Sequence, residues 1–345
     1  MLCMILVSCT GQKTGKENDN NDKIAIEVGE IKFPPQDVLQ LKSYYLSSSV
    51  HVDSIDYLIG YNYRLHSLDC MNLKSKSVTQ IVLPGDGPDA IVRLSGIYAQ
   101  SLDSVWISDE SERAFLIDSV GTIKRMIDLK KYLEDQEQLL INTNYAMFTS
   151  HLFYNASRHS LMFLVKHTPS NTFIVKEVFI DEVGKMATYQ LSSSKVVPDM
   201  SKGYAYINFP NVNFVGENIV YNYPVESSIY MLDIRTNERK YILADSHYTS
   251  NIIEKCTTSG DYATLEKHWL ENSHFYDIMY LPKYKIYARL HADKVDFDEK
   301  KGMEKLINER DLYLMLFDEN MEKIGETKLS NCRYSPFTSW NATYG

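Results

Sequence analysis

The chain has 345 residues, of which 44% are hydrophobic and 12% aromatic, and its formal net charge is -9. This much apolar sequence can bury a large core, which excludes a chain that is disordered throughout. The negative charge argues against a nucleic-acid-binding surface, because a phosphate backbone requires a basic stripe. The five cysteines include no Cys-x-x-Cys pair, so the sequence indicates neither a zinc framework nor a disulfide-rich scaffold, and we expect no cofactor.

The N-terminus has features of an export signal. Residues 1–7 are almost wholly apolar, and residues 6–9 (LVSC) resemble a bacterial lipobox, in which the cysteine carries lipid after cleavage. We therefore expect a signal region over 1–9, a lipid anchor at Cys9 and a flexible tether over 10–22. The apolar run is short and no basic residue precedes it, so an apolar N-terminus without a signal function is the alternative.

A repeated pattern runs through residues 23–345: an apolar strand, an aspartate, a polar turn and a returning strand. The five aspartates of the pattern are Asp69, Asp118, Asp181, Asp233 and Asp318. Four short strands with tight turns are typical of one propeller blade. The sequence therefore predicts an all-β chain whose single domain, over 23–345, is a β-propeller of about six four-stranded blades. Each aspartate stands where a strand meets its turn, and we interpret it as a hydrogen-bond acceptor for turn amides rather than as a ligand.

The N- and C-terminal segments of this domain determine how the propeller ring closes. A sixth unit starts at residues 334–340, but the chain stops at Gly345, so the last blade is either incomplete or closed by an N-terminal strand. A blade without its outer strands leaves backbone groups unpaired, which proteins avoid. The alternation in residues 23–28 predicts a strand there, and we expect it, with the stretch around 37–52, to complete the ring.

Residues 244–273 interrupt the repeat and are interpreted as an insertion. Within it, residues 261–270 favour a short helix. The charged segment from Asp293 to Arg310 is expected to be a solvated loop, since its acidic residues lack the spacing of a calcium-binding loop.

No linear motif indicates catalysis. Residues 85–88 (GDGP) lack the Lys-Ser/Thr ending of a phosphate-binding loop, so a turn is expected. Residues 192–195 (SSSK) fit Ser-x-x-Lys, but the companion motifs of such a nucleophile are missing. The nine histidines form no His-Glu-x-x-His motif. The two remaining interpretations are that there is no metal site, or that ligands from loops distant in the sequence form one.

Three segments carry a resemblance to a known family. They are residues 83–91 (LPGDGPDAI), 102–107 (LDSVWI) and 220–230 (VYNYPVESSIY). In these segments the chain resembles the domain-of-unknown-function family 4221, whose members are bacterial envelope lipoproteins predicted to be β-propellers. The resemblance implies a lipid-anchored protein of the cell envelope, at the outer membrane, and it brings no activity and no catalytic residues.

Function in a propeller is expected at the mouth of the central channel, where the innermost strands begin and loops are held by a rigid scaffold. The candidate ligand-binding residues at these positions are Arg93, Asn144, Tyr206, Asn208, His274 and Tyr276. Ordinary packing of the channel wall is the alternative for each of them.

Two functions are compatible with these features. The first is a non-catalytic propeller, attached to the membrane through Cys9, that binds a protein, peptide or glycan. The alternative is an envelope hydrolase or lyase whose site lies at the channel mouth. A pocket that joins His274, Arg93 and a carboxylate would favour the enzyme, whereas an aromatic mouth without titratable pairs would favour the binding protein.

Overall fold

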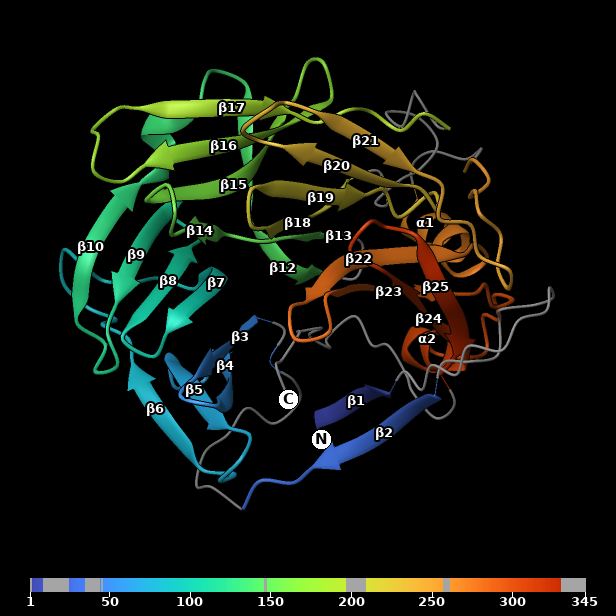
Figure 1. Cartoon of the computed structure of the whole chain (residues 1–345), viewed down its shortest axis with the longest axis horizontal. Coiled ribbons are helices and arrows are strands. Elements are labelled where there is room, and N and C mark those ends of the chain that lie inside the picture. Colours follow the sequence, from blue (N-terminus) through green and yellow to red (C-terminus); the bar gives the residue numbers. More distant parts are fainter. Residues whose placement is uncertain are drawn as a thin grey trace.

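The structure is a computed structural model, and it describes residues 2–8, 25–34, 44, 46–145, 148–196, 209–256 and 261–329. Five β-sheets follow one another around a ring (Figure 1). The predicted β-propeller is therefore confirmed. The number of blades is corrected, because the described residues form five blades rather than six.

Three blades are antiparallel sheets whose four strands follow chain order. The first blade contains β3 (Ser47–Val52), β4 (Ile55–Asn62), β5 (Ser67–Asn72) and β6 (Val78–Val82). The second contains β7 (Leu94–Ser101), β8 (Ser104–Asp109), β9 (Arg113–Ile117) and β10 (Ile123–Asp128). The fifth contains β22 (His274–Leu281), β23 (Ile286–Ala292), β24 (Leu312–Phe317) and β25 (Lys323–Lys328).

The third and fourth blades have additional strands. In the third blade, the two short strands β11 and β14 both pair with the same edge of β15. The strands of this blade are β11 (Glu137–Leu140), β14 (Phe153–Asn155), β15 (Ser160–His167), β16 (Thr172–Phe179) and β17 (Met186–Gln190). The fourth blade is extended on its inner side by a hairpin; its strands are β12 (Asn142–Tyr145), β13 (Phe148–Ser150), β18 (Asn211–Val215), β19 (Asn218–Asn222), β20 (Ile229–Asp233) and β21 (Arg239–Ile242).

A two-stranded antiparallel sheet lies between the fifth and first blades (Figure 1). It consists of β1 (Leu2–Ser8) and β2 (Ala25–Ile31). The predicted N-terminal strand is thus confirmed as β2. Its partner β1 lies within residues 1–9, which were expected to form the signal region. This small sheet takes the position in the ring where a complete sixth blade was expected. Residues 334–340, the predicted start of that blade, lie outside the described residues.

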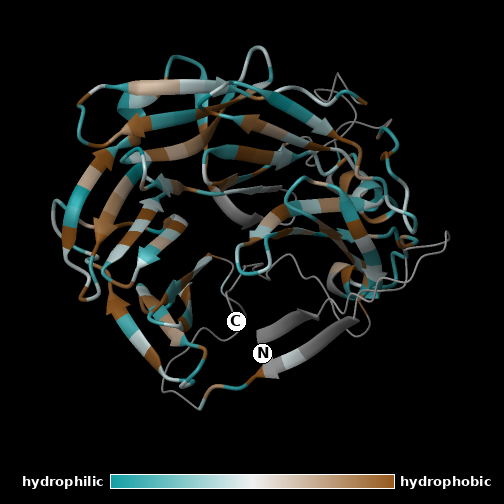
Figure 2. Ribbon diagram, in the orientation of Figure 1, coloured by the Kyte–Doolittle hydropathy of each residue, from teal (hydrophilic) through white to brown (hydrophobic). Residues whose placement is uncertain are grey.

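The core lies between neighbouring blades. Hydrophobic residues are concentrated along the strands (Figure 2), and the apolar clusters join the first blade to the second, the second to the third, the third to the fourth and the fourth to the fifth. The middle strand β23 is buried along its whole length, as expected for a strand packed on both faces. The outer strand β10 instead carries exposed Lys124 and Arg125, which oppose pairing of this edge with another chain.

The turn between the third and fourth strands of a blade is held as predicted in three cases. Oδ1 of Asp118 accepts hydrogen bonds from two turn amides, at 2.8 and 3.1 Å. Asp318 accepts the corresponding two amides in the fifth blade, and Asp233 accepts the amides two and three residues further on in the fourth. These aspartates therefore cap turns, as interpreted from the sequence.

The interpretation is wrong for Asp69, and Asp181 makes other contacts. Asp69 lies inside β5, is fully buried and accepts hydrogen bonds from the side chains of Asn62 and Gln80. The turn of the first blade is held three residues later by Asn72, whose Oδ1 accepts the amides of residues 74 and 75 at 3.0 and 2.8 Å. Asparagine provides the same acceptor as aspartate, so the repeat continues with a different residue. Asp181 is exposed and lies 3.1 Å from Arg125 Nη1.

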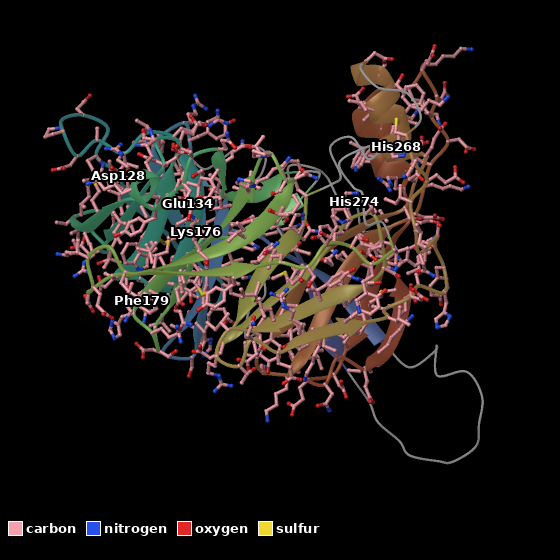
Figure 3. The ribbon with its side chains drawn as sticks, turned by 90° about the horizontal axis from the view of Figure 1, so that it is seen from above. Asp128, Glu134, Lys176, Phe179, His268 and His274 are labelled. Atoms are coloured by element: carbon pink, nitrogen blue, oxygen red, sulfur yellow. The ribbon has the colours of Figure 1, made fainter. Side chains whose placement is uncertain are left out.

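Two helices stand over the fifth blade. The predicted helix is confirmed as α1 (Tyr262–Leu270), and Asp261 caps it by accepting the amide of Thr264 at 2.7 Å. The expected solvated loop after β23 is corrected: it contains α2 (Met303–Glu309), because Leu306 and Ile307 bury their side chains in the core beside α1. Figure 3 shows α1 projecting from one face of the ring, which we call the upper face.

Candidate functional site at the upper face and centre of the ring

The structure places the six predicted channel-mouth residues in different surroundings. Tyr206 and Asn208 lie outside the described residues, and Asn144 lies in β12. Arg93 precedes β7 and is 62% exposed, with its Nε 3.5 Å from Glu110 Oε1. His274 and Tyr276 lie at the start of β22, both buried, and their ring centroids are 4.7 Å apart. Among the described residues of this set, His274 and Tyr276 lie in contact with each other.

His274 belongs to a buried aromatic cluster at the base of α1 (Figure 3). Trp269 Nε1, at the end of α1, donates to His274 Nδ1 at 3.2 Å. Because an indole N–H can only donate, Nδ1 of His274 is unprotonated and the imidazole is neutral. Burial, followed by the nearby charge of Arg310, holds the pKa of His274 well below its ordinary value, which agrees with this assignment.

Arg310 connects this cluster to both helices. Its guanidinium carbon lies 5.0 Å from the centre of the Trp269 ring. Its Nε donates to the carbonyl of Asp293 at 2.6 Å, and its Nη2 donates to the carbonyl of Asn272 at 2.7 Å. These contacts join the segment after α1 to the segment that leads into α2. The cluster thus holds α1 on the ring as a fixed projection of the upper face.

Sequence reasoning named His274 and Tyr276 but missed Trp269 and Arg310. The two missed residues are 41 positions apart by their numbers and meet only because α1 and the β23–β24 connection pack side by side. No spacing in the sequence reveals such a pair. The charge of Arg310 instead favoured a solvated loop.

The arrangement predicted for an enzyme is not formed by His274 and Arg93. Arg93 belongs to the second blade and His274 to the fifth, and the charged side chain that influences His274 is that of Arg310 rather than a carboxylate. In the part of the chain that the structure describes, the contacts of His274 are with Trp269, Tyr276 and the charge of Arg310, and none of these groups orients it as a general base.

The centre of the ring is crossed by the β12–β13 hairpin. β12 lies beside β7 of the second blade, and β13 lies beside β18 and β22. Asn211 holds this arrangement, since its Oδ1 accepts the amide of Thr149 at 2.7 Å and its Nδ2 donates to the carbonyl of Phe275 at 3.1 Å. His151 follows the hairpin, and its Nε2 lies 3.7 Å from Oδ2 of Asp277 in β22. A histidine and a carboxylate therefore lie 3.7 Å apart at the centre, and this pair includes neither His274 nor Arg93, the residues on which the enzyme alternative rested.

A second buried polar cluster fixes the insertion against the fifth blade. Glu326 has no exposed surface, and Ser246 Oγ donates to its Oε1 at 2.5 Å. His291 Nε2 lies 2.9 Å from the same oxygen, while Lys323 Nζ and the amide of His247 donate to Oε2 at 2.6 and 3.0 Å. Burial is the largest cause that lowers the pKa of His291, which favours the neutral imidazole in this cluster.

This cluster combines a serine, a histidine and an acid, but it is not a catalytic triad. A triad requires the histidine between the serine and the acid, so that the imidazole can accept the serine proton. Here Ser246 and His291 both contact Glu326. Nδ1 of His291 lies 3.2 Å from Thr249 Oγ1, so neither ring nitrogen is oriented toward Ser246 Oγ. The arrangement stabilises the insertion and does not activate a nucleophile.

Comparison with known proteins identifies the family. The sequence profile of DUF4221, a domain of unknown function, matches residues 17–328. The chain belongs to the DUF4221 family. The resemblance seen in three segments of the sequence is thereby confirmed over most of this DUF4221 chain. No match was found among curated proteins.

Two solved structures are similar to this DUF4221 protein. A DUF4221 member from Bacteroides vulgatus aligns with a TM-score of 0.67 and 14% identity, over 86% of this chain and 84% of that one. A candidate exported protein from Bacteroides fragilis aligns with a TM-score of 0.52 and 14% identity, over 86% of this chain and 74% of that one. At this identity the comparisons establish the fold. None of the helices in the described residues has the combination of length and apolar character that crossing a membrane requires.

Proposed function

We propose that this DUF4221 protein is a lipid-anchored binding protein of the bacterial cell envelope whose upper face binds a protein, peptide or glycan. The observation that carries the proposal is the fixed position of α1, which the buried Trp269, His274 and Arg310 hold above the ring. Insertions held on a rigid scaffold are typical binding elements. The similar fold of a candidate exported protein and the lipobox-like residues 6–9 support the envelope location.

Site-specific photo-crosslinking tests the binding face. Lys267 in α1 has 54% of its side chain exposed and is suited to replacement by a photoreactive phenylalanine. Val183, fully exposed in the turn after β16, is the matched control, because the end of β16 at Phe179 lies away from α1, toward the opposite face of the ring (Figure 3). We expect envelope fractions to yield a discrete adduct with the Lys267 variant and none with the Val183 variant. Equal adducts from both positions, or none from Lys267, would contradict the proposal.

Lipid attachment is tested separately at Cys9, which lies outside the described residues. We expect radiolabelled palmitate to enter the wild-type protein and not a Cys9→Ala variant, because acylation requires this thiol. Cleavage before Cys9 would also remove β1, so the mature protein would lose the partner of β2. Equal labelling of the two proteins would show that the anchor is absent, whereas binding at the upper face would be unaffected by this result.

A further inference from the structure

We propose that Asp277 and His151 form a site for an organic cation, the ammonium or guanidinium group of a basic side chain, at the centre of the ring. The inference rests on the proposed function, since the basic side chain belongs to a peptide segment of the bound partner. The central pair, Asp277 and His151, recognises the positive charge of that side chain.

The first observation is an incompletely satisfied carboxylate. Asp277 is 3% exposed, yet in the described part of the chain its one polar partner is His151, at 3.7 Å. This distance is longer than a hydrogen bond. The carboxylate is nearly buried and makes no hydrogen bond in the described part of the chain, so a cation within contact distance would stabilise its charge. The side chain of His151 is 23% exposed, so the pair can be reached from solvent.

The second observation is the backbone that carries Asp277. Phe275 pairs with His291 and Ile278 pairs with Arg289, so β22 contains one residue more than β23 over this interval. Such a β-bulge changes the direction of the side chains within it and occurs frequently next to functional sites. Asp277 lies within this bulge and faces His151, whereas Ile278 after it packs in the apolar cluster between the fourth and fifth blades.

Three asparagine amides from the fourth blade hold the bulge in place. Asn211 and Asn222 donate to the carbonyl of Phe275, at 3.1 and 3.4 Å. Asn213 donates to the carbonyl of Ile278 at 3.2 Å. The backbone is therefore bound on both sides of Asp277, and the carboxylate is preorganised before any ligand arrives.

An organic cation fits this pair better than a metal ion. Protein zinc sites use three or four ligands. Over the residues that the structure describes, no group of three or more His, Cys, Asp or Glu side chains is placed to hold a metal ion. One carboxylate beside a ring nitrogen instead matches an ammonium or guanidinium group, which needs one charged acceptor and further neutral acceptors.

The test uses the full chain and three synthetic pentapeptides, Gly-Ser-X-Ser-Gly, in which X is lysine, arginine or norleucine. Binding is followed by calorimetry and by the imidazole NMR signals of His151. We expect the lysine and arginine peptides to bind and to shift these signals, and the norleucine peptide not to bind. Asp277→Asn should weaken binding about tenfold, whereas Asp311→Asn, at an exposed ion pair of the fifth blade, should leave it unchanged.

A second variant covers the case in which Asp277→Asn does not fold. His151→Glu places another carboxylate at a partly exposed position and should strengthen binding of the lysine peptide about threefold. Unchanged affinity in either variant, or equal binding of the norleucine peptide, would overturn the inference. Binding of Zn²⁺ alone that is lost in His151→Glu and Asp277→Asn would identify a metal site and would overturn it as well. If the crosslink from Lys267 persists in these cases, the proposed binding function stands without the central cation site.

Discussion

Replacement of Glu326 by alanine is expected to lower the free energy of unfolding by about 3–5 kcal/mol, the usual cost of removing one partner from a buried charged cluster. The variant leaves Lys323 and His291 without their shared acceptor and removes the contact that holds Ser246. Urea unfolding curves followed by tryptophan fluorescence measure this loss. Asp311→Ala is the control, because its ion pair with Lys328 is exposed and should contribute less than about 1 kcal/mol.

The contribution of Glu326 should depend on pH in a defined direction. Burial alone would raise the pKa of Glu326, but the hydrogen bonds from His291, Lys323, Ser246 and the amide of His247 lower it from 4.5 to about 2. A carboxyl group whose pKa is lower in the folded state stabilises the fold above its unfolded pKa. The difference in stability between the wild type and Glu326→Gln should therefore be full above pH 4.5 and should decline as the pH falls toward 2. A difference that grows on acidification would contradict this assignment.

Replacement of Lys176 by methionine is expected to cost a similar amount, about 3–5 kcal/mol. Lys176 lies in the middle of β16 (Figure 3). Its side chain has no exposed surface, and it donates to Glu137 and, at 2.7 Å, to the carbonyl of Tyr132. Methionine fills much of the same volume but leaves the nearly buried carboxylate of Glu137 without its cation. The amide of Glu134 then remains as its hydrogen-bond donor.

A double-mutant cycle separates the loss of the pair from the cost of the orphaned charge. Lys176→Met combined with Glu137→Leu should recover most of the lost stability, since a well-packed apolar pair often replaces a buried ion pair at little cost. Lys130→Met is the matched control, because Lys130 is 62% exposed and lies 3.9 Å from Glu112. If the double variant is as unstable as Lys176→Met alone, the destabilisation comes from packing rather than from the unpaired carboxylate.

The repeat shows what a local pattern can predict. Asp118, Asp233 and Asp318 hold their turns as expected, since a turn capped by its own first residue is decided by a few consecutive positions. The same reasoning failed at Asp69, because asparagine at position 72 satisfies the turn equally well and the pattern was counted by aspartate alone. The repeat thus placed three turns correctly and misplaced the turn of the first blade by three residues.

The candidate site was predicted only in part. His274 and Tyr276 were named because they begin an innermost strand, and they do lie together. The partners of His274, and the pairing of His151 with Asp277, were not predicted. These contacts join residues brought together by the order of the blades, by a helix packed on the ring and by a bulge in β22.

The sequence by itself determined the strands, most of their turns, α1 and the propeller, because two-residue alternation and turn chemistry are properties of short segments. The tertiary structure decided the number of blades, the closure between β1 and β2, and the position of α2. It also decided which polar side chains meet in the interior. A buried charge is tolerated only where distant segments provide its partners, so Glu326 and Lys176 acquire their roles from the packing of the ring.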